Sequence, residues 1–448
     1  MSVHFARLRA PLLRRPGLWE SATSLHRLQP ERCCRQLSAL CVAIALLPQT
    51  AAVAVALPAP SYYELLHQAE AIAPRLLESH AEVGVARGLA DQASAWPNPT
   101  GSILFENFAG GQTALTGLST QQTTLSLSQP IEWGGKRSAR IAAGAAEVSA
   151  AQARDEQALA AFGYDLALAY AGAETAKAKV GLYQEAAQAA AEDVRGTQAL
   201  VDAGREAGIR AKQANAAYLA AQSDLEGALA EADQSLARLS ALVAAPQSFT
   251  DITPSLLPLV VSLKRPSIAA PKIFPAVTIA EAERDAALGK LDYENNRVIP
   301  DVTATLGVRR LQGEHATVLV GGMSLPIPLF DQNSGNISAA GSQVAAAGAR
   351  LAAARADAET GWRAAILQAN ASVSRLSAAW SAAAAAQEAY DLTRIGYQSG
   401  KTSLLDLLNA RRTLTDARLR LLDAQVARIA AEALLARLAG KTPFGDMP

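Results

Sequence analysis

A stretch that occurs twice at a constant spacing constrains this chain more than any other feature. Ser128–Ile131 (SQPI) returns as Ser324–Ile327 (SLPI), and the offset is 196 residues (324 − 128). Gly204-Arg205 returns as Gly400-Lys401 with the same offset (400 − 204). Loops tolerate changes in length, so an unchanged length between these landmarks indicates one continuous rigid element in each copy. The chain is therefore predicted to contain two structural repeats of the same plan.

The segments between the landmarks are predicted to be very long helices. They are rich in alanine and almost free of proline, and each is followed by a glycine turn and a returning helix. We expect helical hairpins at about 137–244 and 337–438. A helix of some 65 residues spans roughly 100 Å, which exceeds an ordinary globular helix and indicates a coiled-coil rod. Two rows spaced by seven residues form a heptad seam in the last helix: Leu407, Leu414, Leu421, Arg428 and Leu435, with Ala410, Ala417, Ala424, Ala431 and Leu438.

A pair of strands is predicted before each long helix. The first pair is expected at about 102–108 and 123–131, and the second at about 301–311 and 317–327. Apolar residues alternate there with threonine, serine and glycine, which is the period of a strand with one apolar face. A half-buried soluble hairpin is one interpretation. The other is a contribution to a transmembrane barrel, with Trp133 at the membrane interface.

The remaining segments complete the domain plan. Residues 1–56 run from an arginine-rich stretch through a short apolar run to small residues, which predicts a secretory signal peptide. The first repeat is expected at 57–245, and its opening helix at 61–95 has Ser61 as a plausible N-cap. The later boundaries are a proline-rich linker without regular structure at 246–276, a second repeat at 277–440 that opens with a helix at about 276–297, and a C-terminal tail at 441–448.

Composition and charge exclude several classes of function. The 41 basic and 41 acidic residues give a formal net charge of zero, so no basic surplus exists to neutralise the phosphates of nucleic acid. All cysteines lie within the predicted signal peptide, and the histidines beyond it are far apart in the sequence: Cys33, Cys34 and Cys41, then His67, His80 and His315. No spacing resembles a metal site or a catalytic constellation. We therefore expect no cofactor and no enzymatic activity.

Four segments resemble the TolC family of outer-membrane factors, and most of all its CzcC branch, which serves heavy-metal efflux. They are Trp96–Pro99, Gln129–Arg137, Pro326–Gly335 and Gly396–Ala410. The resemblance covers essentially the whole chain after the predicted signal peptide. It implies a mainly α fold with a β-barrel portion, built from two repeats that each hold a strand pair and a long coiled-coil helical hairpin.

The resemblance also implies an assembly. Each of three protomers would give four strands to a twelve-stranded barrel in the bacterial outer membrane, and the helices would continue the barrel as a periplasmic tube. Four strands cannot close a barrel alone, because small barrels need about eight, so the strand count itself points to more than one chain. The implied partners are a periplasmic membrane-fusion (adaptor) protein, an inner-membrane RND pump and outer-membrane lipid.

Site residues follow from the same resemblance. The family's adaptor-facing hairpin tips match Gly204-Arg205 and Gly400-Lys401 in this sequence. Trp133 and Phe330 stand where aromatic side chains would meet the membrane interface. These six residues are expected at the two ends of the helical tube, with the tips in the periplasm and the aromatics at the outer membrane.

The periplasmic constriction of the family is expected to be less acidic here. Asp406 is retained in the matching motif, but Asn409 stands where the family has its constricting aspartate. Arg210 stands in the first copy where a relative has an aspartate. A cation-binding gate therefore does not carry over directly to this chain.

The expected function is a passive outer-membrane exit duct of a tripartite RND-type system that exports divalent heavy-metal cations. One alternative keeps the duct and changes its cargo to drugs or to polypeptides of type I secretion. Another alternative is a periplasmic adaptor protein, which normally has one coiled-coil hairpin flanked by small β-domains. The two length-matched hairpins of this chain, each preceded by an amphipathic strand pair, argue against the adaptor.

Overall fold

A computed structural model describes residues 58–107, 121–260, 262–263 and 270–444 of the chain. The chain divides into two units, Met1–Val55 and Ala56–Pro448, and all described residues belong to the second. The predicted signal peptide lies outside the described residues. The fold below is therefore that of the second unit.

Two helices precede the first strand, where the sequence predicted one. Helix α2 spans Tyr62–Ile72 and helix α3 spans Pro74–Ser94. The prediction of a continuous helix is wrong at Ala73, which is extended (ψ 123°), because the ring of a proline disfavours helical backbone in the preceding residue. Ser61 does cap α2: it accepts the backbone N–H of Glu64, and the Glu64 carboxylate accepts the N–H of Ser61.

The two long helical hairpins of the prediction are present. Helix α4 (Lys136–Asp202, 67 residues) returns as α5 (Gly208–Leu242), and α8 (Ser334–Gln398, 65 residues) returns as α9 (Leu404–Leu438). The two returning helices have 35 residues each. At about 1.5 Å per residue, α4 is roughly 100 Å long. The nearly equal lengths of α4 and α8 agree with the constant offset in the sequence.

The segment between the repeats holds regular structure that the sequence did not predict. A short helix, α6, spans Leu256–Leu259, and Ala59 forms a parallel bridge with Ile252. The prediction that residues 246–276 lack regular structure is therefore wrong at α6 and at the bridge between Ala59 and Ile252. Pro258 is tolerated because it lies in the first turn of α6, where a backbone N–H has no partner within the helix. Helix α7 (Pro275–Asn296) then opens the second repeat.

Four strands form one antiparallel sheet in the order β1-β2-β3-β4. Their bounds are Thr100–Glu106, Gln122–Ile131, Val302–Leu311 and Ala316–Ser324.

The predicted strand bounds agree with the structure to within two residues except at the end of β4. That strand was predicted to reach residue 327 but ends at Ser324, which pairs with Thr303. Beyond Thr303 only Val302 of β3 is left to pair with, and Pro326 has no N–H to donate. The chain therefore leaves the sheet earlier in the second repeat than in the first, where Pro130 still lies inside β2.

The sheet has one apolar face and one face rich in hydroxyls. A row of apolar residues lies in register across all four strands, and every member is exposed: Ile103, Leu125, Val308 and Leu319. On the other face, hydroxyls contact one another between strands, as Ser128 does with Thr305 at 2.9 Å. The alternation in the sequence thus corresponds to two chemically different faces.

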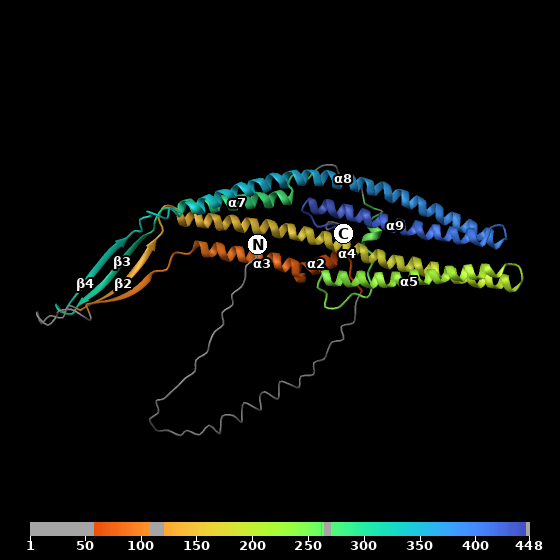
Figure 1. The fold of residues 1–448 in the computed structure, drawn as a ribbon, viewed down its shortest axis with the longest axis horizontal. Helices are drawn as coiled ribbons and strands as arrows, with labels where there is room; N and C mark the ends of the chain where they lie inside the picture. Colours follow the sequence, from red (N-terminus) through yellow and green to blue (C-terminus); the bar gives the residue numbers. More distant parts are fainter. Residues whose placement is uncertain (1–57, 108–120, 261, 264–269, 445–448) are drawn as a thin grey trace, which may run out of the picture. The chain divides into compact units, whose positions relative to one another are not determined.

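Helix α4 lies at the centre of the helical layer (Figure 1). On one side it packs against α3 and then α5, and on the other side against α7 and then α9. Helix α8 packs outside α7 and α9. Helices α3 and α5 therefore form one edge of the layer, and α8 forms the other.

The largest apolar cluster lies where α2, α6 and the middle of α4 meet α5 and α9. Its most deeply buried members include Tyr62, Leu166, Tyr170, Leu239, Ile252, Leu256 and Ile429. Further along α9, the predicted heptad row is buried at Leu407, Leu414 and Leu435, and alanines of the facing helices allow the close approach. Arg428 occupies the same row and forms an ion pair with Glu432 at 2.5 Å.

Candidate functional sites at the two ends of the long helices

The two hairpin turns have the same backbone design. Gly204 and Gly400 follow α4 and α8 with φ values of +70° and +74°. The N–H of Gly204 donates to the carbonyl of Val201, and the N–H of Arg205 donates to that of Leu200, both at 2.9 Å. This is the Schellman motif, which needs a left-handed residue at its first position. Each glycine of the predicted turns thus directly follows the C-cap of its helix, which is Ala203 in α4 and Ser399 in α8.

The second turn repeats these hydrogen bonds. The N–H of Gly400 donates to Tyr397 at 3.0 Å, and the N–H of Lys401 donates to Gly396 at 2.8 Å. Arg205 and Lys401 follow their glycines and are exposed. Both predicted tips therefore present a cation on a short, backbone-fixed turn.

The three predicted constriction residues have different local roles. Asp406 belongs to the capping box of α9, where its carboxylate accepts the hydroxyl of Ser403 at 2.7 Å and the N–H of Ser403 at 3.1 Å. These hydrogen bonds hold the pKa of Asp406 below its usual value. Arg210 donates to Gln213 at 3.2 Å, and Asn409 is exposed. Among the described residues, no hydrogen bond or ion pair joins Arg210, Asp406 and Asn409.

Farther from the tips, ion pairs and hydrogen bonds hold α9 to its neighbours. Arg411 pairs with Asp193 of α4, and both side chains are largely buried. Burial raises the pKa of Asp193, and the nearby guanidinium of Arg411 opposes that rise. Arg418 donates to Glu185 of α4 and to Gln387 of α8, both at 2.7 Å. The sequence showed these charges but not which ones would meet.

The first sheet-to-helix junction is held by ion pairs and by contacts with backbone carbonyls. Arg140 forms a two-pronged ion pair with Glu132, one contact of which measures 3.0 Å, and also donates to carbonyls at the end of α3. Lys136 is buried and contacts Asp301 at 2.6 Å. Gly134 has a φ of +71°, and a Cβ there would overlap the side chain of Ile299, so any other residue would be strained at this position. Most of the motif at 129–137 therefore positions α4 on the sheet.

The predicted interface aromatics both lie beside the sheet and are exposed. Trp133 follows β2 with 64% of its surface exposed, and Phe330 lies between β4 and α8 with 99% exposed. The sequence did not single out Trp96, which is also 64% exposed and stacks under the guanidinium of Arg137 at 4.7 Å. Its place in the motif Trp96–Pro99, directly before β1, was the available signal.

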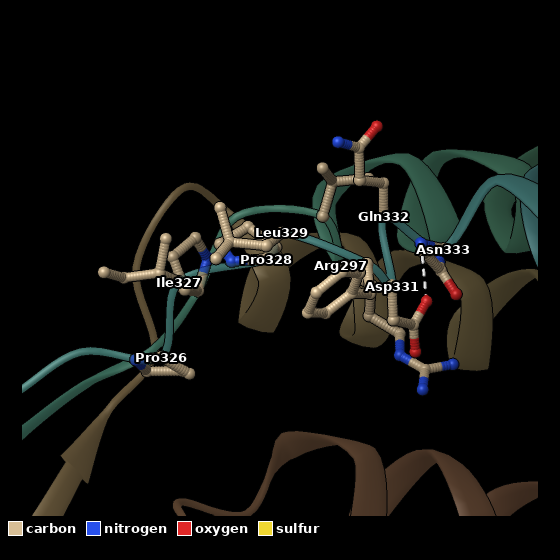
Figure 2. A pocket seen from close by; sticks show the side chains of 11 residues that line it. Arg297, Pro326, Ile327, Pro328, Leu329, Asp331, Gln332 and Asn333 are labelled. Atoms are coloured by element: carbon tan, nitrogen blue, oxygen red, sulfur yellow. Dashed lines mark hydrogen bonds between the residues drawn. The ribbon is translucent and has the colours of Figure 1, made fainter.

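The second junction is built differently from the first. Asn333 donates to the Glu294 carboxylate and to its backbone carbonyl, each at 2.8 Å, and its own N–H donates to Asp331 at 2.9 Å. Figure 2 shows Ile327 and Leu329 projecting from the segment into open space. An open hollow of about 450 Å³ is lined by Arg297, Val298, Pro300 and residues 326–333. The polar contacts thus anchor only the α8 end of this segment.

Two chemical observations apply to the described residues. They contain no group of three or more His, Cys, Asp and Glu side chains that is arranged to hold a metal ion. Their helices include none that is long and apolar enough to cross a membrane.

Comparison with known proteins identifies the family. The sequence matches the family described as "Outer membrane efflux protein" at residues 65–245 and 274–441. It is 41% identical over 409 residues to the nickel-cobalt-cadmium resistance protein NccC of Alcaligenes xylosoxydans xylosoxydans, covering 91% of this chain and 93% of the relative. It is 30% identical over 344 residues to the cobalt-zinc-cadmium resistance protein CzcC of Cupriavidus metallidurans, covering 74% of this chain and 78% of the relative.

A solved structure supports the same fold. A crystal structure of CusC superposes with a TM-score of 0.72 at 19% sequence identity, covering 85% of this chain and 92% of that chain. The resemblance to TolC-family factors of the CzcC branch is confirmed, together with the fold of paired strands and long hairpins. The chain belongs to the outer membrane efflux protein family.

Proposed function

We propose that three copies of this chain form a passive outer-membrane exit duct of a tripartite efflux system, and that the duct exports divalent heavy-metal cations. The cargo is inferred from the two relatives, whose names refer to resistance to nickel, cobalt, cadmium and zinc. Export to the outer membrane depends on the predicted signal peptide at 1–56. Selection of the metal is assigned to the inner-membrane pump, and the duct conducts what the pump delivers.

The observation that carries the proposal is the exposed apolar face of the sheet. Ile103, Leu125, Val308 and Leu319 form a continuous row across four strands with no cover from the described residues. Such a surface is unfavourable in water but suits the hydrocarbon of a membrane, while the hydroxyl face suits a wet lumen. Strands β1 and β4 leave two edges that need partners. Copies of the same sheet supply those partners in a closed ring.

The helical layer supports the same assembly. Its two edges carry large apolar side chains that are exposed in the single chain, among them Leu219 on α5 and Leu367 and Leu392 on α8. In a ring of three copies, α8 of one copy lies next to α3 and α5 of the next. The twelve-stranded barrel then continues into a helical tube.

The hairpin turns are proposed as the docking end for the periplasmic adaptor. Gly204-Arg205 and Gly400-Lys401 have the same rigid geometry in each repeat, so a trimer presents six similar tips. Arg210, Asp406 and Asn409 lie within one to three turns of these tips and are proposed to line the constriction. With one acid, one base and one amide, this ring has no surplus of negative charge to hold a metal cation.

The assembly is tested by the mass of the purified protein in mild detergent. We expect three chains plus the detergent micelle, measured by light scattering with the protein and detergent contributions separated. A stable monomer that keeps its helix content would refute the shared barrel, because four strands cannot close on their own.

The cargo is tested in a strain that lacks the gene. We expect sensitivity to nickel, cobalt, zinc or cadmium, raised cellular content of that metal, and recovery when the gene is restored. The panel includes several hydrophobic drugs. Sensitivity to drugs with unchanged metal tolerance would leave the duct in place and reject metals as its cargo.

Docking is tested separately by inserting seven residues near Ala190 in α4 alone, which moves one tip and leaves the sheet intact. We expect this variant to lose pump docking and efflux. Normal efflux from it would contradict the rigid, length-matched hairpins.

A further inference from the structure

The two sheet-to-helix junctions occupy matched positions in the repeats, but the first buries charged side chains and the second exposes apolar ones. In the first junction, Glu132 and Lys136 are buried in ion pairs with Arg140 and Asp301. The matched positions of the second junction are Pro328 and Gln332, which form no such pairs. Its neighbouring apolar residues, named here the apolar segment, are instead exposed: Leu325, Ile327, Leu329 and Phe330.

The exposure of the apolar segment indicates a missing partner. Ile327 and Leu329 are more than 70% exposed and Phe330 is 99% exposed, although they lie within four residues of one another. Isolated apolar side chains on a surface are ordinary, but a contiguous group of this size marks an interaction site. Asp331 and Asn333 fix the backbone just beyond it, so the group is presented on an anchored segment.

The sheet register shows which surface the apolar segment would meet in a closed ring. Ser324 pairs with Thr303, and Thr303 also pairs with Pro130. Thr100, at the start of β1, pairs with Ser128, two residues from Pro130. The free edges β4 and β1 therefore end at nearly the same level of the sheet, and they run antiparallel. When β4 of one copy pairs with β1 of the next, the residues after Ser324 lie beside the residues before Thr100.

The residues before Thr100 form a hollow of suitable size. It measures about 400 Å³ and is lined by Leu89, Trp96 and Pro97, together with the end of α3 and Arg140. A cavity of about 150 Å³ is enough to hold a benzene ring. The Trp96 wall is held in place, since Arg137 stacks on it at 4.7 Å and donates to the carbonyl of Ser94 at 2.7 Å. Leu89 and Trp96 are exposed in the single chain.

We propose that the apolar segment of one copy packs into the hollow of the next copy, with the ring of Phe330 against Leu89 and Trp96. This proposal rests on the trimer of the proposed function. The contact would join neighbouring protomers at the level where the sheet meets the helices. It also reassigns Phe330 from the lipid interface to the boundary between protomers. The first junction needs no such partner because β2 and α4 lie inside the protomer, where ion pairs already hold them.

Paired cysteines test the contact in the full-length protein. The cysteines of the native sequence all lie in the predicted signal peptide. A variant with Phe330→Cys and Trp96→Cys therefore places the two thiols whose cross-linking reports the proposed contact. Oxidation, or a short bis-maleimide, should give two-chain and three-chain bands in denaturing gels. Phe330→Cys with Trp133→Cys is the matched control: Trp133 is as exposed as Trp96 but follows the inner strand β2, so no such bands should appear.

The outcomes separate this contact from the trimer itself. The wild-type mass is measured first. Three chains without cross-linking between positions 330 and 96 would overturn the contact and leave the duct standing, whereas a monomer would overturn the duct as well. A membrane-confined maleimide should label Phe330→Cys far more slowly than Leu319→Cys on the apolar row. Equal labelling would assign Phe330 to lipid and reject the contact.

A double-mutant cycle provides a second measurement. Phe330→Ala and Trp96→Ala should each lower the temperature at which the three-chain band dissociates in detergent. The double variant should lower it no further than the larger single change, because both substitutions remove the same contact. Strictly additive shifts would contradict packing of one residue against the other.

Discussion

Replacing Glu174 by alanine should release the segment between the repeats from α4. Glu174 is 3% exposed, and its carboxylate accepts three consecutive backbone N–H groups, those of Ser255, Leu256 at 2.9 Å and Leu257 at 2.7 Å. They are the N–H groups at the start of α6, which have no partner within that short helix. One side chain on α4 thus holds the start of α6.

The expected loss of local stability depends on how well water can replace the carboxylate as the acceptor of these three N–H groups. The N–H of Leu256 is buried, and a buried N–H without a partner costs about 1–3 kcal/mol. The other two are partly buried, and each loses about 1 kcal/mol. Together these terms give roughly 3–5 kcal/mol for Glu174→Ala. Glu174→Gln keeps one acceptor oxygen for two of the donors and should lose about half as much.

Hydrogen exchange of the peptide covering residues 252–260 measures this release. At 1.4 kcal/mol for each factor of ten, the amides of Glu174→Ala should exchange about 100- to 4000-fold faster. The control is Glu192→Ala, an exposed acid on the same helix, which should leave exchange within a few-fold of wild type. If the two variants exchange alike, the carboxylate does not hold the segment, and its docking depends on the apolar contacts of Ile252 and Leu256.

Three further predictions concern the turns, the cap and the core. Gly400→Ala should destabilise its hairpin by about 1–2 kcal/mol, because Gly400 has a positive φ. Gly196→Ala should instead stabilise the protein by roughly 1 kcal/mol, because Gly196 lies inside α4 with open space around it. Thermal unfolding of the two variants compares these effects. The pKa of Asp406 is lowered in the folded protein, so the helix cap is fully formed above the unfolded pKa and is lost as the pH falls through the folded pKa. Ser403→Ala should raise the pKa of Asp406 back toward its usual value, which NMR titration measures. Burial raises the pKa of Tyr170 to about 12, so its phenolate absorbance should not appear on titration to pH 11 unless the protein unfolds.

The repeat, the long helices and the strand pairs were predictable because each is written in local periodicity. Heptad spacing, alternation of apolar and hydroxyl side chains, and glycine at the two turns are properties of neighbouring residues. Two of the errors lie where a proline or a partner strand overrides the local pattern. Pro74 divides a helix that the surrounding pattern favours, and β4 ends at Ser324 because its partner strand ends.

The contacts that hold these elements together were decided only by the tertiary structure. Asp193 and Arg411 are 218 positions apart, and Glu174 and Leu256 are 82 apart. The chain has 41 acidic and 41 basic residues, many of them on long helices, and sequence alone gives no reason to prefer one pair. The difference between the two junctions has the same origin. Matched positions share a backbone plan, but those of the first lie inside the protomer and those of the second at its edge, and only the arrangement of the strands makes that distinction.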